Sequence, residues 1–107
     1  MSKYLLNKAI KDTQKVANKM PGNKDWVVHT RFVELVEEVG ELANAIQTDE
    51  GYKSKSRKKS EVVDSICDIL WEILLIAGLY KVDLDWEYPK VLKQINKRRK
   101  AGEFEHI

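Results

Sequence analysis

The sequence contains little cysteine and little histidine. Its 107 residues include one cysteine, Cys67, so no disulfide can form within the chain. A single thiol fits a reducing compartment, and we expect a cytoplasmic protein. The two histidines, His29 and His106, lie outside the acidic stretches of the chain. A di-iron carboxylate site, which uses paired Glu-x-x-His motifs, is therefore not expected.

The chain also lacks a long apolar run and a large excess of charge of one sign. Its most apolar stretch, ICDILWEILLIAGLY at 66–80, is interrupted by Asp68 and Glu72. It is shorter than the roughly 20 residues that a membrane-spanning helix needs. The first residues, MSKYLLNKAIK, contain no sustained apolar run, so we expect no signal peptide. The net charge of +2 does not by itself favour binding to nucleic acid.

Helical periodicity dominates the sequence, and no segment reads convincingly as a strand. Proline and glycine in PGN at 21–23 end the first helix, and the lysine-rich connector TDEGYKSKSRKKS at 48–60 separates the second from the third. Asp83 or Asp85 is expected to cap the last helix. The first three expected helices span about 3–20, 26 or 29 to 47, and 58–80, and the fourth begins after KVDLD at 81–85 and ends near Lys100. We predict one all-α domain over residues 1–107, a four-helix bundle.

The second helix carries four glutamates within an arc of roughly 100°. They are Glu34, Glu37, Glu38 and Glu41. Like charges at this spacing destabilise a helix by a few tenths of a kcal/mol per pair. Either water solvates an exposed face, or a positive group lies between the carboxylates.

The third helix carries a second acidic stripe, made of Glu61, Asp64, Asp68 and Glu72. The same helix face continues into leucines and so points toward the protein, and we expect Asp68 to be partly enclosed. Burying ionised carboxylates without a partner is costly, so lysines, arginines or a divalent cation must neutralise them. Oxygen ligands without nearby histidine match Mg²⁺ or Mn²⁺.

Four pieces of the sequence, in order, resemble the MazG-type all-α nucleoside triphosphate pyrophosphohydrolases. They are KDW at 24–26, EEVGE at 37–41, an acidic helix containing DILWEILLIA at 68–77, and KVDLD at 81–85 followed by VLKQINKRR at 91–99. The first and last of these are similar to the small dCTP-hydrolysing members. The resemblance implies Mg²⁺-dependent hydrolysis of a nucleoside triphosphate to monophosphate and pyrophosphate, in cleansing or balancing the nucleotide pool.

The resemblance also implies roles for individual carboxylates. Glu38 and Glu41 match the family's metal-binding pair, and Glu37 is the leading glutamate of that motif. Either Glu37 or Glu38 is expected to orient the attacking water or to accept its proton. Asp68 matches the terminal aspartate of the E-x-x-D motif on the next helix.

At one position the sequence departs from the family's pattern. Ser65 stands where the glutamate of E-x-x-D is expected. We expect Asp64 to replace the missing ligand, with Glu61 as the second choice, because a helix turn can present either carboxylate to the same space. This departure leaves the number of metal ions open.

Other residues are candidates for substrate binding. Trp26 is expected to stack on a base or, alternatively, to be buried. The cationic and amide residues Lys93, Asn96, Arg98 and Arg99 match the family's K…N.RR run and are expected to meet phosphates or, alternatively, to pair with the end of their own helix.

The third helix is apolar nearly all round from Ile69 to Tyr80, and three partner helices cannot cover it. We therefore expect a homodimer or a homotetramer that completes the bundle. Two rival functions remain open. One is a non-catalytic module of the same fold, and the other is a bundle that binds nucleic acid or a protein through KSKSRKK at 53–59 and KRRK at 97–100.

Overall fold

The computed structural model describes residues 4–105, and all regular structure in this part of the chain is helical. The α-helices are α1 (Leu6–Ala17), α2 (Val28–Asp49), α3 (Val62–Leu79) and α4 (Leu84–Lys100), with short 3₁₀ helices η1 (Asn23–Asp25) and η2 (Lys55–Arg57). The predicted all-α class with four helices is confirmed. Residue 3, the expected start of the first helix, and His106 lie outside the described residues. Within that range, no helix combines the length and the apolar character needed to cross a membrane.

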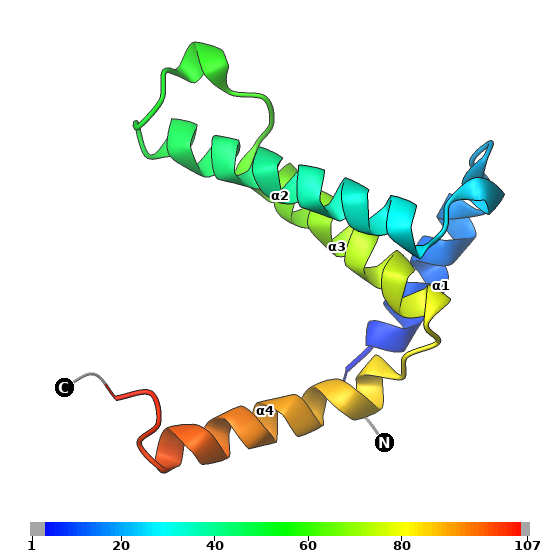
Figure 1. Cartoon of the computed structure of the whole chain (residues 1–107), viewed down its shortest axis with the longest axis vertical. Coiled ribbons are helices and arrows are strands. Elements are labelled where there is room, and N and C mark those ends of the chain that lie inside the picture. The colour runs from blue at the N-terminus through cyan, green and yellow to red at the C-terminus, as the bar shows by residue number, and fades with distance from the viewer. Residues whose placement is uncertain (1–3, 106–107) are drawn as a thin grey trace.

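Helices α2 and α3 run side by side in opposite directions and form the main packing interface (Figure 1). The connector between them is tied back to α2 by the Asn44 side chain. The Asn44 amide nitrogen donates to the carbonyl of Arg57 at 3.3 Å, and its amide oxygen accepts from the Lys59 N–H at 3.1 Å. These bonds hold the connector against the end of the helical pair.

Helix α1 packs against the second half of α3. The buried residues Ile10, Leu74 and Ala77 form the apolar core at this contact. The two helices pack closely at Gly78, where an added Cβ would meet the end of the Gln14 side chain and would lie 3.2 Å from a methyl group of Ile10. The core therefore lies at one end of the molecule, beside the start of α2.

The start of α4 is bonded to the start of α1. Asp83 caps α4 by accepting from the Trp86 N–H at 3.2 Å, as the sequence predicted for Asp83 or Asp85. Asp85 instead accepts from the Leu6 N–H at 2.8 Å and so satisfies the first turn of α1. These bonds fix the position of the α3–α4 junction.

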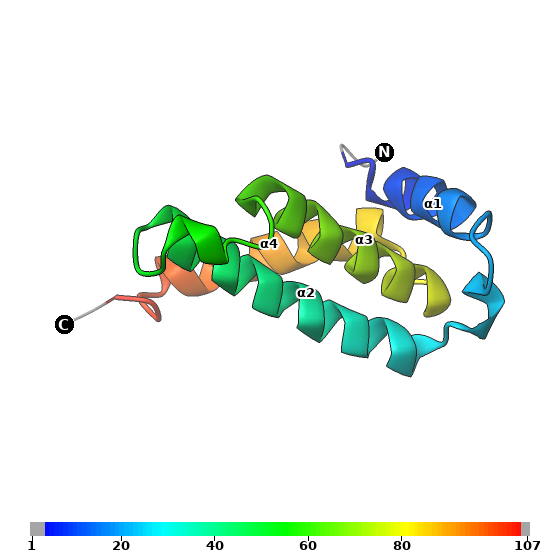
Figure 2. The same ribbon diagram turned by 90° about the horizontal axis from the view of Figure 1, so that it is seen from above.

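Beyond this junction α4 diverges from the α2–α3 pair (Figure 1), and in the view from above it passes behind that pair (Figure 2). None of its residues is buried. The radius of gyration is 17.3 Å, against about 13 Å for a compact domain of this length. Large apolar side chains are correspondingly exposed on three helices, among them Phe32, Val36, Val39, Ile66, Leu70, Ile73, Val91 and Ile95. The helices do not close into a bundle within one chain, and completion by another copy stays a prediction.

Candidate metal-binding and catalytic site

Three of the predicted carboxylates come together between α2 and α3. One carboxylate oxygen from each of Glu38, Glu41 and Asp68 lies within 4.8 Å of the other two. The spacing of the two glutamates on α2 places both on the side that meets α3. Glu38 and Glu41 are half-buried, whereas Asp68 is exposed, contrary to the enclosure expected from the sequence. We refer to these residues as the carboxylate trio.

Glu38 has the most perturbed environment in the trio. Burial, followed by the negative charge of Glu41 and by contacts with Glu34 and Asp68, raises the pKa of Glu38 to about 7. Its Oε2 atom is buried and has no hydrogen-bond partner among the described residues. An orphaned oxygen among several carboxylates is the donor set that a hard divalent cation such as Mg²⁺ prefers. The residues present therefore fit such an ion.

An open pocket of about 290 Å³ adjoins the trio on the side toward α1. We call it the acidic pocket; it is lined by Met20, Glu34, Glu38, Asp68, Trp71 and Glu72. Two of its carboxylates come from α2 and two from α3. Since like charges face one another across this space, it attracts cations.

A buried ion pair lies beside the acidic pocket. Nη1 of Arg31 lies 3.1 Å from Oε1 of Glu72, and the two side chains are 8% and 4% exposed. The Arg31 guanidinium also donates to the Asn23 side chain and lies 4.5 Å from the centre of the Trp26 ring. Burial raises the pKa of Glu72, and the charge of Arg31 opposes this shift.

The sequence predicted no role for Arg31, and it identified Glu72 only as part of a stripe. One signal could have found the pair. Arg31 precedes Glu34 and Glu38 by three and seven residues, so it lies on the same face of α2. A single arginine at the end of a carboxylate stripe indicates a partner on the opposing helix.

The carboxylates at the start of α3 lie outside the trio. Glu61 is the N-cap residue of α3, and its Oε2 atom lies 2.8 Å from Nζ of Lys58. Asp64 is exposed, and Ser65 is buried with its hydroxyl 2.6 Å from that of Ser60. Glu37, on α2, is exposed and also outside the trio. Metal binding by Asp64 or Glu61, and catalysis by Glu37, stay predictions.

The predicted substrate-binding residues are divided between two places. Trp26 is half-buried, with the Arg31 guanidinium over its ring. Lys93, Asn96, Arg98 and Arg99 are exposed on α4 and do not line the acidic pocket of their own chain. Arg98 pairs with Glu103, and Nε of Arg99 donates to Asn96. Their roles toward a substrate stay predictions.

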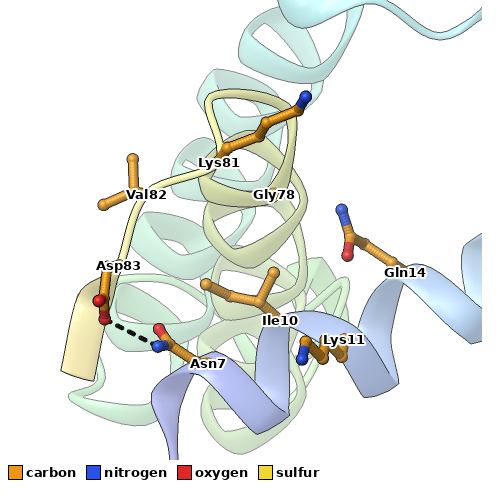
Figure 3. A pocket seen from close by; sticks show the side chains of 8 residues that line it. All are labelled: Asn7, Ile10, Lys11, Gln14, Gly78, Lys81, Val82 and Asp83. Atoms are coloured by element: carbon orange, nitrogen blue, oxygen red, sulfur yellow. Dashed lines mark hydrogen bonds between the residues drawn. The ribbon is translucent and has the colours of Figure 1, made fainter.

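A larger pocket of about 470 Å³ lies elsewhere, between α1 and the α3–α4 junction (Figure 3). The Asn7 amide donates across its edge to Asp83 at 2.8 Å. Lys11, Gln14 and Lys81 also line it, and none of its lining residues belongs to the acidic pocket. The predicted metal-binding carboxylates therefore do not line the larger of these two pockets.

Comparison with known proteins identifies the family of this chain. A sequence profile of the MazG nucleotide pyrophosphohydrolase domain matches residues 27–101. The chain is also 26% identical over 106 residues to the uncharacterized protein YvdC of Bacillus subtilis (strain 168), covering 89% of this chain and 95% of YvdC. No solved structure matches the chain significantly. Because the profile covers most of the chain, including the trio and the Arg31–Glu72 pair, this protein belongs to the MazG nucleotide pyrophosphohydrolase domain family.

Proposed function

We propose that this protein hydrolyses a nucleoside triphosphate to a nucleoside monophosphate and pyrophosphate, with a divalent cation as cofactor. The observation that carries the proposal is the carboxylate trio, with the buried and unpartnered oxygen of Glu38 at its centre. Membership of the MazG family supports the same reaction. Cleavage between the α- and β-phosphates consumes one water molecule, and the bridging oxygen leaves with one of the two products.

Glu38, Glu41 and Asp68 are the residues that would hold Mg²⁺ or Mn²⁺. When bound, such an ion neutralises triphosphate charge and lowers the pKa of a coordinated water. The three side chains come from two helices that are packed along their length, so the ligand set is held by the main interface of the molecule. The proposed further ligands are Asp64 and, as second choice, Glu61, at the start of α3.

The attacking water needs a group that orients it and accepts its proton. We assign this role to Glu38 or to its neighbour Glu37. Glu38 is half-buried within the trio, so its carboxylate lies where a water held near the metal ion would meet it. Glu37 is exposed, so its carboxylate is accessible to water.

The remaining substrate contacts require surfaces that one chain does not bring together. Trp26 is proposed to stack on the base, and Lys93, Asn96 and Arg99 to bind phosphates. Because α4 diverges from the acidic pocket, we propose a homodimer or homotetramer in which a second copy covers the exposed apolar faces of α2, α3 and α4. Light scattering that gives a monomer mass at micromolar concentration would contradict this assembly.

The reaction is tested by measuring pyrophosphate release from canonical and modified nucleoside triphosphates, with Mg²⁺, with Mn²⁺ and with EDTA. We expect metal-dependent release from at least one triphosphate, and its loss in Glu41→Gln. Glu50→Gln is the matched control, since Glu50 is exposed at the far end of α2. If no triphosphate yields pyrophosphate in a metal-dependent way, the proposed reaction is wrong.

A further inference from the structure

Glu72 carries an oxygen atom that the proposed reaction does not use. The residue is 3% exposed, and Arg31 binds only its Oε1 atom. The Oε2 atom is buried without a hydrogen-bond partner among the described residues, and Glu72 lines the acidic pocket. A buried carboxylate oxygen without a donor destabilises the fold unless another group binds it.

Arg31 holds Glu72 in this position. Its guanidinium is fixed by three contacts, to Glu72, to the Asn23 side chain and to the ring of Trp26. With Oε1 engaged by Arg31, the Oε2 atom of Glu72 has no partner among the described residues, and Glu72 is one of the residues that line the acidic pocket. Arg31 is thus a positioning residue for this carboxylate.

The charges around the pocket are unbalanced. The trio, with Glu34 and Glu72, makes five carboxylates. Within residues 4–105, Arg31 is the one cationic side chain that forms an ion pair with any of them. If all five carboxylates are ionised, the charge of Arg31 leaves a net charge of −4. One divalent cation would reduce this net charge to −2, and two would reduce it to zero.

We infer that Glu34 and Glu72 hold a second divalent cation in the acidic pocket, next to the ion of the trio. Glu38 and Asp68 line the same pocket and belong to the trio, so both ions would share them. A pocket of about 290 Å³ has room for an ion that keeps several of its waters, as Mg²⁺ does. This inference rests on the proposed function, because it presupposes the first ion at the trio.

The test counts bound Mn²⁺ per chain. Metal-free protein is titrated with Mn²⁺ alone, and free Mn²⁺ is measured by electron paramagnetic resonance. We expect two ions per chain in the unmodified protein and one in Glu72→Gln. Since Glu72→Gln also removes the charged partner of Arg31, Glu34→Gln provides an independent test that leaves the buried ion pair intact, and it too should bind one ion. Glu50→Gln, the matched control, should bind two.

Other counts would overturn the inference. Two ions in both pocket variants would mean that the second ion lies elsewhere, with Asp64 and Glu61 as the remaining carboxylates. One ion in every protein would mean that no second ion exists, while the proposed reaction at the trio would stand. No bound Mn²⁺ in the unmodified protein would contradict the inference and also the metal dependence of the proposed reaction, which the pyrophosphate assay measures separately.

Discussion

The α2–α3 pair has carboxylates at both of its ends, and their surroundings differ. At the connector end, Nζ of Lys58 lies 2.8 Å from a carboxylate oxygen of Asp49 and 2.8 Å from one of Glu61. At the end toward α1, Arg31 is the one cationic side chain within residues 4–105 that forms an ion pair with a carboxylate of the acidic pocket, that of Glu72. Carboxylates are thus neutralised by a lysine at the connector end, whereas Glu38 and Glu72 each have an oxygen without a hydrogen-bond partner at the other end.

Burial separates the two ends as well. Asp49, Glu61 and Asp64 are exposed, so water screens their charges. Glu38 is half-buried and Glu72 is buried. Unneutralised charge is costly only where water is excluded, so a bound cation would stabilise the end toward α1 more than the connector end. Four predictions test this difference.

The largest effect on stability is expected from breaking the buried ion pair. In Arg31→Met, Glu72 loses its charged partner at a buried position. We expect the free energy of unfolding to fall by about 3–5 kcal/mol, measured by urea unfolding with EDTA present. A double variant, Arg31→Met with Glu72→Leu, should recover most of this loss. An unfolding midpoint equal to that of the unmodified protein would show that the pair does not stabilise the fold.

The next effect concerns turnover. Asp68→Asn removes a carboxylate of the trio, and we expect pyrophosphate release to fall by about 10²–10³-fold, the loss typical of removing one electrostatic contribution to a transition state. Glu61→Gln should cause a smaller loss, because its carboxylate is paired with Lys58. Steady-state rates at saturating metal measure both. If Glu61→Gln reduced turnover more than Asp68→Asn, the essential metal ligand would be Glu61, at the connector end.

A smaller effect is expected on the pH dependence of stability in the metal-free protein. The pKa of Glu38 is raised from 4.5 to about 7, so the folded state binds a proton that the unfolded chain has released. This contribution to stability is complete below pH 4.5 and is lost as the pH rises to about 7. Glu38→Gln should therefore raise the Tm above pH 7 in EDTA and flatten the dependence below it. If the difference in Tm between Glu38→Gln and the unmodified protein were the same at pH 4 and at pH 8, this prediction would be wrong.

The sequence was sufficient to predict the all-α class, the four helices and the carboxylates of the trio. Helical spacing and local breakers such as PGN at 21–23 determine the helices, and both can be read from the sequence. The Asp83 cap was predictable for the same reason, because capping depends on neighbouring residues. The three carboxylates were singled out by the resemblance of EEVGE at 37–41 and of Asp68 to the MazG motifs. The sequence could not predict the divergence of α4, since this depends on how α1, α3 and α4 meet.

The site was predicted less completely, for a physical reason. Helical spacing places four carboxylates on one face of α3, those of Glu61, Asp64, Asp68 and Glu72. It does not show which of them face carboxylates of α2 without a lysine or arginine nearby. That depends on Lys58, which pairs with Asp49 and Glu61 at the connector, and on Arg31, which lies 41 residues from its partner Glu72. Asp68 was expected to be enclosed, but Glu72 is the buried residue. Sequence periodicity therefore identified the stripe, and the packing of α2 on α3 selects its members.

The smallest effect is expected at the connector end, where Lys58→Met removes the cation. Asp49 and Glu61 hold the pKa of Lys58 above its ordinary value, so the ammonium is fully charged at neutral pH. The partners are 46% and 66% exposed, so water replaces the lost contacts and salt screens what remains. We expect a fall in Tm smaller than any change above, one that disappears in about 1 M NaCl, and turnover close to that of the unmodified protein. A loss of turnover comparable with that of Asp68→Asn would place the connector cation at the substrate, and the two ends of the α2–α3 pair would then form one functional surface.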